Sequence, residues 1–456
     1  MAIKPVTLKG TRDFSAIEIS KRDYIKNILK NTFEYFGFQP IETPSFERLE
    51  TLTGVYGEEG DRLVFKILNS GEKVKKADTE ALASGQFQKF SRSLSEKALR
   101  YDLTVPFARY VAQHQNELSF PFRRYQIQPV WRADRPQLGR FQEFYQCDAD
   151  IVGDRSLWQE VEVLALYDSA FKDLKIEGIQ LKINHRKILA GIVLSFGVKE
   201  LLLDFTIALD KLDKIGKDGV FKELLAKKFP EHALHLLEKL LSLDGSNSEK
   251  LTSLKEILSG QQEGLEGIEE LEFILNQLEL TSLSSVTLDF DLTLARGLHY
   301  YTGMIVEVSP PKTVKIGSIG GGGRYDDLTS SFGLKNMSGI GVSFGFERIY
   351  LVMEALNLFP EKLLPSTEVL FANFGLEEAA LSYSYVSILR QQNVACELYP
   401  TQAKLKKQLG YANQKNIHKV VLIGEEEVRQ QTFVLKDMKS GTQISYPIKD
   451  LKTIFS

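Results

Sequence analysis

Little in this 456-residue chain points to a disulfide framework, a zinc site or a membrane. Cys147 and Cys396 are too few for a disulfide framework, and no Cys-x-x-Cys pair suggests a structural zinc ion. No apolar run approaches the roughly 20 residues of a membrane span, and the N-terminal segment lacks the apolar centre of a signal peptide. These absences predict a reduced, cytoplasmic setting without membrane contact.

A strong charge of either sign is also missing. The formal net charge is −3, with 43% hydrophobic and 26% charged residues. This balance argues against an indiscriminate nucleic-acid binder and leaves room for one that uses local basic patches. The length suffices for two or three domains with substantial cores.

The segment 120–153 concentrates arginines, carboxylates and aromatic residues while it still alternates like β-structure. We expect one strand from Tyr125 to Trp131 and a second from Phe141 to Ile151, joined by a turn at 135–139. Such a hairpin brings a guanidinium, an amide and a carboxylate to one sheet face, which suits an anionic polar ligand. A charged hairpin with a solvated face is the alternative. The side chains concerned are Arg132, Arg140, Gln146 and Asp150.

Asp102 and Thr104 offer a carboxylate and a hydroxyl two positions apart. On a strand they share a face and suit a donor such as an ammonium group. The alternative is a capping role for a helix that begins near Pro106.

The segment 294–303 places Arg296 close to two adjacent tyrosines, Tyr300 and Tyr301. A cation beside two phenols provides both charge and hydrogen-bonding groups. The tyrosines alone are equally typical of a core corner.

Two glycine-rich segments follow. The four consecutive glycines at 320–323 let backbone approach a ligand closely, although a flexible hairpin connection explains them equally well. Glycines at 339, 341 and 345 leave room beside a strand for a planar base, and Arg348 follows them at the start of a helix.

The remaining chain shows ordinary patterns. Apolar periodicity predicts a helix over 17–36, followed by an extended segment to Glu47. Asn184 is expected to cap a helix from about Lys187, which competes with a catalytic role for His185. Residues 197–284 have helical periodicity without a chemical cluster, and strands and helices alternate from Val369 onward.

Five of these stretches resemble the signatures of one family, the histidyl-tRNA synthetases of the class II aminoacyl-tRNA synthetases. They are WRADRPQLGRFQEFYQ, LRYDLTVPFARY, RGLHYYTG, GGGRYD and GIGVSFGFER. His299 stands where the family usually has aspartate, a departure three residues from Arg296.

The resemblance implies an α+β fold, in which an antiparallel sheet forms a class II catalytic domain with a helical insertion and an α/β anticodon-binding domain follows. The implied ranges are 1–196 and 285–360 for the catalytic domain, 197–284 for the insertion and 366–456 for the anticodon-binding domain. A homodimer is also implied, as is an approach of the insertion to the tRNA acceptor arm.

The implied activity is that of a histidine–tRNA ligase, which uses ATP with Mg²⁺ to form histidyl-adenylate and then acylates histidine tRNA. Arg132 and Arg296 are the implied catalytic residues, and no protein metal site is expected. L-histidine would contact these two arginines together with Asp102, Leu103, Thr104, Gln146, Asp150, Tyr300 and Tyr301. ATP would contact Arg132 and Arg348, and the tRNA acceptor end would contact Arg135 and Gln137. The alternative is a catalytically inactive regulatory paralogue from histidine biosynthesis, which usually lacks the C-terminal domain.

Overall fold

The computed structural model describes residues 4–54, 61–281, 283–295, 300–361, 363 and 367–455. The chain divides into two compact units, residues 1–359 and 360–456. Within the described ranges, no helix is both long enough and apolar enough to cross a lipid bilayer.

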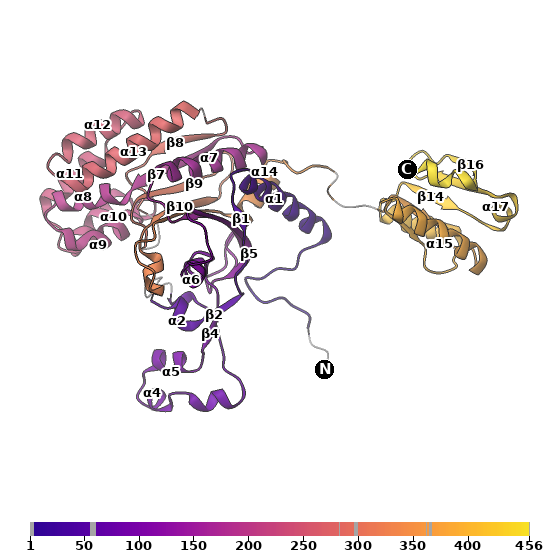
Figure 1. The fold of residues 1–456 in the computed structure, drawn as a ribbon, viewed down its shortest axis with the longest axis horizontal. Helices are drawn as coiled ribbons and strands as arrows, with labels where there is room; N and C mark the ends of the chain where they lie inside the picture. Colours follow the sequence, from indigo (N-terminus) through magenta and orange to yellow (C-terminus); the bar gives the residue numbers. More distant parts are fainter. Residues whose placement is uncertain are drawn as a thin grey trace. The chain divides into compact units, whose positions relative to one another are not determined.

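The described residues of the first unit build an eight-stranded sheet (Figure 1). Its six inner strands pair antiparallel, while each edge strand runs parallel to its neighbour. The strand order is β1 (Gln39–Pro40), β5 (Phe122–Trp131), β6 (Glu143–Val152), β11 (Gly339–Phe344), β10 (Gly320–Tyr325), β9 (Met304–Ser309), β7 (Ile179–His185) and β8 (Val286–Phe290). The predicted hairpin is confirmed as β5 and β6, the second and third strands of this sheet.

Strand β6 separates the two faces of the sheet by the alternation of its side chains. Its odd-numbered residues Cys147, Ala149 and Ile151 enter the main hydrophobic core. Its even-numbered residues Gln146, Asp148 and Asp150 are polar and line cavities on the opposite face. A single strand thus supplies core residues and site residues at alternate positions.

Helices cover both faces of the sheet. The main core packs against α1 (Ala16–Tyr35), α7 (Trp158–Asp173) and α14 (Phe346–Ala355). A smaller cluster on the face of the polar side chains includes α6 (Thr104–His114) and lies beside the 3₁₀ helix η3 (Leu328–Phe332). Helix α1 begins with a capping box between Ser15 and Glu18, which fixes its start close to the predicted residue 17.

The four consecutive glycines lie within strand β10, so the interpretation as a flexible hairpin connection is wrong. A methyl group on Gly322 would lie 2.1 Å from the carbonyl oxygen of Gly341 on β11. A methyl group on Gly323 would lie 2.6 Å from the carbonyl oxygen of Met304. Glycine is required here because the neighbouring backbones approach too closely for any side chain.

The segment between residues 67 and 97 contains short helices. A three-stranded sheet of β2 (Phe46–Arg48), β4 (Lys97–Leu99) and β3 (Lys66–Ile67) carries a projection that Figure 1 shows extending away from the large sheet. Helix α2 (Leu49–Leu52) follows β2, and the projection contains η1 (Gly71–Lys76), α4 (Thr79–Ala83) and α5 (Phe87–Ser93).

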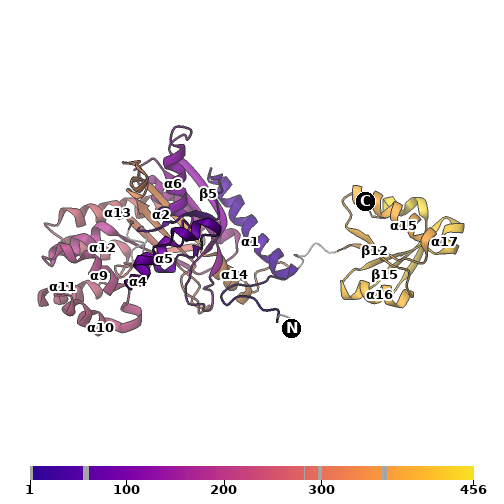
Figure 2. The same ribbon diagram turned by 90° about the horizontal axis from the view of Figure 1, so that it is seen from below.

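The helical segment predicted for 197–284 packs closely on helix α8 (Arg186–Ser195), which follows β7 of the large sheet. Where α8 meets α13 (Gln262–Thr281), a methyl group on Gly191 would lie 2.6 Å from the Cα atom of Gly264. Figure 1 shows the labelled helices of this segment gathered beside α8, and Figure 2 shows α9 to α13 grouped together. The helices of this segment are η2 (Lys199–Leu201), α9 (Leu202–Leu209), α10 (Leu212–Ala226), α11 (Glu231–Leu241), α12 (Asn247–Ile257) and α13.

The junction of β7 and α8 differs from the prediction. Strand β7 continues through His185, whose Nδ1 atom caps α8 by accepting a hydrogen bond from the backbone N–H of Lys187. The Nε2 atom of the same imidazole lies 2.8 Å from the Glu270 carboxylate on α13. Asn184 is therefore not the cap, and His185 has a structural role.

Asn184 instead holds the segment that precedes the tyrosine pair. Its Nδ2 atom donates to the carbonyl oxygens of Leu292 at 3.1 Å and Leu294 at 2.9 Å. The backbone N–H of Arg186 donates to the carbonyl oxygen of Gly303 at 3.0 Å. The same junction therefore anchors the chain on both sides of Tyr300 and Tyr301.

The second unit contains a five-stranded sheet in the order β13-β12-β14-β15-β16. Its parallel part and its alternation with helices follow the predicted pattern, while a short helix after β14 was not predicted. The elements are β12 (Val369–Phe371), α15 (Leu376–Gln391), β13 (Cys396–Leu398), α16 (Leu405–Gln414), β14 (Lys419–Leu422), α17 (Glu425–Gln430), β15 (Thr432–Asp437), β16 (Gln443–Pro447), η4 (Ile448–Asp450) and α18 (Leu451–Ile454).

Candidate active site

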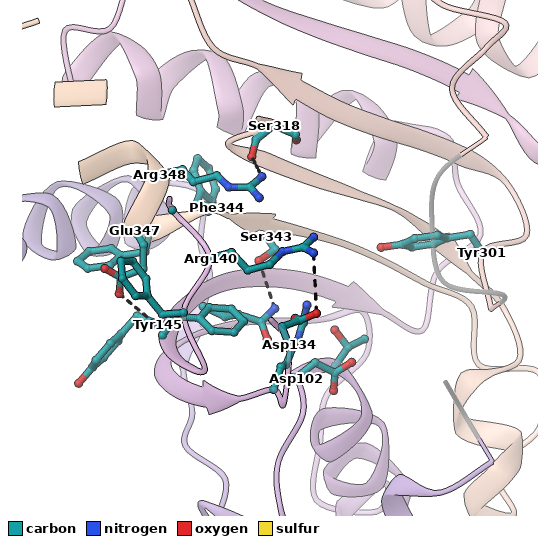
Figure 3. Close-up of a pocket in the computed structure, with 18 of the residues that line it drawn as sticks. Asp102, Asp134, Arg140, Tyr145, Tyr301, Ser318, Ser343, Phe344, Glu347 and Arg348 are labelled. Carbon is teal, nitrogen blue, oxygen red and sulfur yellow. Dashed lines mark hydrogen bonds and ion pairs between the residues drawn. The ribbon is translucent and has the colours of Figure 1, made fainter. Parts of the chain in front are cut away.

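A cavity of about 340 Å³ opens on the polar face of the large sheet (Figure 3). It lies between the β5–β6 hairpin, the end of β11, the start of α14 and the turn before α6. A side cavity of about 20 Å³ adjoins it and shares Thr104, Tyr300, Tyr301 and Ser343 with its lining. The site therefore has a larger compartment and a small, deeper one.

Arg132 follows β5 directly and lines the larger compartment. Its Nε atom donates to the carbonyl oxygen of Tyr101 at 3.0 Å. Its guanidinium lies over the rings of Tyr101 and Phe144, with centroids at 4.3 and 5.2 Å. It forms no ion pair with any described residue, so its charge remains available to an anionic ligand.

Asp102 and Thr104 lie at the start of α6 and not on a strand, so the strand geometry was wrong. Asp102 Oδ1 accepts the backbone N–H of Val105 at 3.1 Å, which is the predicted capping role. Both side chains nevertheless line the larger compartment. The helix start thus positions a carboxylate and a hydroxyl at the cavity wall.

Gln146 lies on β6 and lines the larger compartment. Its Nε2 atom donates to the two carboxylate oxygens of Asp148 at 3.4 and 3.3 Å and to Ser343 Oγ at 3.4 Å. Its Oε1 atom is buried and accepts no hydrogen bond from the described part of the chain. A buried amide oxygen without a donor suits a ligand that carries N–H groups.

Asp150 reaches only the side cavity, where two groups already bind it. Arg124 Nη2 lies 2.8 Å from Oδ2, and the Tyr325 hydroxyl donates to Oδ1 at 2.7 Å. Burial raises the pKa of Asp150, and the Arg124 charge opposes that rise. A carboxylate has about four acceptor positions, so this one still has capacity for a further donor.

Tyr300 and Tyr301 line both compartments. Their ring centroids are 4.9 Å apart at an interplanar angle of 63°. Burial raises the pKa of Tyr301, so its phenol keeps its proton at neutral pH and can donate a hydrogen bond. Figure 3 shows the Tyr301 side chain on the opposite side of the cavity from Tyr145.

Arg348 lies in the first turn of α14 and lines the larger compartment. Its Nη1 atom donates to the carbonyl oxygen of Ser318 at 2.5 Å, as Figure 3 shows. A methyl group on Gly139 would lie 3.1 Å from Arg348 Cγ, and one on Gly317 would lie 3.2 Å from Nη1. Two glycines thus leave space for this guanidinium.

The other predicted site residues lie outside the cavity lining or outside the described residues. Arg135 and Gln137 are exposed in the β5–β6 loop, and Gln137 exchanges backbone hydrogen bonds with Arg140. The Leu103 side chain is fully buried, so a ligand could meet only its backbone. Arg296 and His299 lie outside the described residues.

Sequence reasoning missed several polar residues that build the site. The alternation on β6 places Asp148 between Gln146 and Asp150 on one face, and this signal was readable from the sequence. Arg124 and Tyr325 became visible only through the pairing of distant segments. Glu347, which lines the larger compartment, binds Arg22 with two short contacts of 2.6 and 2.8 Å.

The described residues contain no group of three or more potential metal ligands. Mg²⁺ typically binds one or two protein carboxylates together with substrate phosphates and water. Glu347, one of the carboxylates that line the larger compartment, is already paired with Arg22. A metal ion at this cavity would therefore take most of its ligands from a bound molecule and water.

The chain is similar to known proteins over most of its length. The family model described as histidyl-tRNA synthetase matches residues 76–349, and an anticodon-binding domain model matches 373–456. The chain belongs to the histidyl-tRNA synthetase family. A histidine–tRNA ligase of Christiangramia forsetii is 60% identical, and the match covers 97% of each chain. One from Flavobacterium johnsoniae is 54% identical over 99% of each chain.

Solved structures agree with this family assignment. The crystal structure of a histidyl-tRNA synthetase from Nostoc sp. PCC 7120 has a TM-score of 0.78 and 28% identity, covering 100% of this chain and 99% of that one. A Bacillus halodurans protein described as an ATP phosphoribosyltransferase regulatory subunit/histidyl-tRNA synthetase matches with a TM-score of 0.72. It is 21% identical over 92% of this chain and 99% of that one, so it shows a shared fold. The predicted α+β fold with a C-terminal anticodon-binding domain is confirmed.

Proposed function

We propose that this protein is a histidine–tRNA ligase that activates L-histidine with ATP and then acylates histidine tRNA. The observation that carries the proposal is the division of the pocket. Arg132, Arg348 and the buried acceptor Gln146 Oε1 belong to the larger compartment, while Asp150 lines the smaller one. An anionic nucleotide and an amino acid that carries an ammonium group and an imidazole match these groups.

In the activation step, a carboxylate oxygen of histidine attacks the α-phosphorus of ATP. A bond forms between that oxygen and phosphorus, and the bond from phosphorus to the bridging oxygen breaks, which releases pyrophosphate. The step brings two anions together, so fixed cations lower its barrier. Arg132 is proposed to neutralise the developing charge, together with Arg296, whose proposed role comes from its place in the motif.

Arg348 is proposed to hold the other end of ATP. Its guanidinium lies beside Gly139 and Gly317, where no side chain blocks a planar base. Guanidinium groups stack on aromatic rings and bind phosphate oxygens, and both actions suit a bent nucleotide. ATP is expected to enter as its Mg²⁺ complex, which supplies further positive charge near the phosphates.

The α-ammonium group of histidine is proposed to bind Asp102, Thr104 and the Oε1 atom of Gln146. These groups are acceptors at the cavity wall, and an ammonium group has three donors. The backbone of Leu103, between Asp102 and Thr104, is proposed to contribute to the same wall.

The imidazole is proposed to lie between Asp150 and Tyr301, with Tyr300 beside it. Asp150 would accept the ring N–H, and the protonated phenol of Tyr301 would donate to the other nitrogen. An apolar competitor would leave both buried groups unsatisfied, and such a mismatch can exclude a ligand by several orders of magnitude.

Acylation requires the terminal ribose of the tRNA to reach the adenylate. Its 2′- or 3′-hydroxyl would attack the carbonyl carbon, and AMP would leave. Arg135 and Gln137 are proposed to contact the acceptor end because both are exposed in the loop beside the pocket. The second unit is proposed to bind the anticodon, and a cytoplasmic homodimer is the proposed working form.

The test is histidine-dependent exchange of labelled pyrophosphate into ATP by the purified protein, followed by transfer of labelled histidine to histidine tRNA. We expect both reactions with histidine and neither with the other amino acids. Binding of histidine without exchange would instead support the regulatory alternative, and exchange with another amino acid would refute the proposed specificity.

A further inference from the structure

Asp148 is a buried carboxyl group that the roles proposed above leave unused. It lines the side cavity between Gln146 and Asp150, and its side chain is only 2% exposed. The nearby cation Arg124 pairs with Asp150 at 2.8 Å and reaches only the backbone carbonyl of Asp148, at 3.5 Å. Asp148 thus forms no ion pair within the part of the chain that the structure describes, which is costly for a buried carboxylate.

The contacts of Asp148 fix the orientation of a neighbouring amide. Gln146 Nε2 donates to both of its carboxylate oxygens, and Ser343 Oγ donates to Oδ1. An ionised carboxylate can only accept hydrogen bonds, so it binds the NH₂ end of the amide and not the oxygen. The Gln146 oxygen is therefore the end left for the larger compartment, which Gln146 also lines.

We propose that Asp148 is a positioning residue for the α-ammonium group of histidine. It holds the Gln146 amide with Oε1 toward the ligand and places a negative charge behind that oxygen. The proposal rests on the proposed function, because the ammonium group belongs to the amino-acid substrate. It explains why a carboxylate without a protein cation is buried here: the ligand supplies the cation.

The charge state of Asp148 is sensitive to its surroundings. Burial raises its pKa to about 7, Arg124 opposes the rise, and Asp150 adds to it. Its negative charge is therefore present above about pH 7 and is lost below it. The titratable and polar groups that face it are Arg124 and Gln126 on β5, Gln146 and Asp150 on β6, Ser343 on β11, Asp102 before α6, and Tyr301.

The test compares two histidine analogues as competitive inhibitors of pyrophosphate exchange. Histidinol keeps the amino group and lacks the carboxylate, while 3-(imidazol-4-yl)propionate keeps the carboxylate and lacks the amino group. Asp148→Asn removes the negative charge and replaces one of the two oxygens that Gln146 Nε2 contacts with an NH₂ group, so the Gln146 amide is no longer fixed with Oε1 toward the ligand. We expect the inhibition constant of histidinol to rise by about tenfold and that of the propionate to change by less than about twofold.

A double-mutant cycle checks that Asp148 acts through Gln146. In a Gln146→Ala background, Asp148→Asn should raise the inhibition constant of histidinol by a much smaller factor than in the wild type, because the oriented amide is already absent. The wild-type-to-variant ratio of the histidinol constants should also approach one as the pH falls below 7. Using the ratio removes the titration of the free imidazole from the comparison.

Asp168→Asn is a matched control, because Asp168 accepts backbone N–H groups of Ser284, Ser285 and Val286 away from the pocket. It should leave both inhibition constants unchanged. The positioning role would be overturned if Asp148→Asn raised the inhibition constants of both analogues by the same factor. It would also be overturned if the effects of Asp148→Asn and Gln146→Ala on histidinol binding were fully additive in free energy. Absence of exchange in the wild type would refute the proposed function itself, so the two failures are distinguishable.

Discussion

Gly341→Ala tests the geometry of the side cavity most directly. Gly341 on β11 is paired with Asp150 on β6. A methyl group on Gly341 would lie 2.0 Å from Asp150 Oδ1, whereas such contacts essentially never fall below 3.0 Å. The carboxyl group must therefore retreat by about 1 Å, which is enough to break its 2.7 Å hydrogen bond with Tyr325.

The magnitude follows from two costs. Overpacking a strand-strand contact costs about 1–3 kcal/mol of unfolding free energy. A displaced Asp150 also weakens its buried contact with Arg124 and can no longer meet an imidazole N–H. Loss of a hydrogen bond to a charged group costs about 1.5–3 kcal/mol, so we expect KM for histidine to rise by at least about tenfold. KM for ATP should stay within about twofold.

The assay is pyrophosphate exchange as a function of histidine and of ATP, with a thermal unfolding curve of the same preparation. Gly410→Ala is the control, because nothing lies within 4 Å of an added methyl group there and the residue is in helix α16. That change should be neutral or slightly stabilising. A Gly341→Ala enzyme with unchanged KM for histidine would refute the proposed role of Asp150.

Four further changes have defined outcomes. Arg132→Ala should lower kcat for exchange by about 100-fold or more, with ATP and histidine at saturation, because a fixed charge is lost at the reacting phosphate; a loss below about tenfold would contradict this. Tyr301→Phe should raise KM for histidine by about tenfold and leave the unfolding midpoint nearly unchanged, which a Michaelis–Menten series and a melting curve would check. Glu347→Gln should cost about 3–5 kcal/mol of stability in denaturant titrations, because it leaves the charge of buried Arg22 unpaired. Burial raises the pKa of Asp148 to about 7, so the folded state binds more protons than the unfolded state between about pH 4 and 7 and loses stability as the pH rises through that window. Asp148→Asn should remove this dependence and be more stable relative to wild type at pH 8 than at pH 4.5.

Much of the architecture was predictable because local sequence patterns indicate the helices and strands that build it. The β5–β6 hairpin, α1 and the alternating C-terminal elements follow periodicity and turn chemistry in the sequence. The glycines at 320–323 show the limit, since their place inside β10 depends on the close approach of β9 and β11. No pattern in a single strand reveals what its neighbours require.

The site was predictable where chemistry lies in short motifs, and less so where it comes from pairing. The pocket positions of Asp102, Thr104, Arg132, Gln146 and Arg348 agree with the motif-based expectation, while their roles stay predictions. The Arg124–Asp150–Tyr325 network joins residues up to 201 positions apart, so no local sequence pattern predicted these contacts. The short helices at 71–93 were missed because polar, glycine-containing sequence is equally typical of a loop.

The contact between α8 and α13 bears on how this enzyme can be dissected. Gly191 and Gly264 bring the two helices into near backbone contact, and a continuous hydrophobic cluster runs from the sheet through Ile188 and Ile192 to α12 and α13. Cutting out residues 197–284 would expose that apolar surface and leave the His185 imidazole without Glu270. A minimal catalytic fragment must therefore retain α13. The segment 197–284 contributes to the hydrophobic core of the first unit, so it cannot be removed as a separate module.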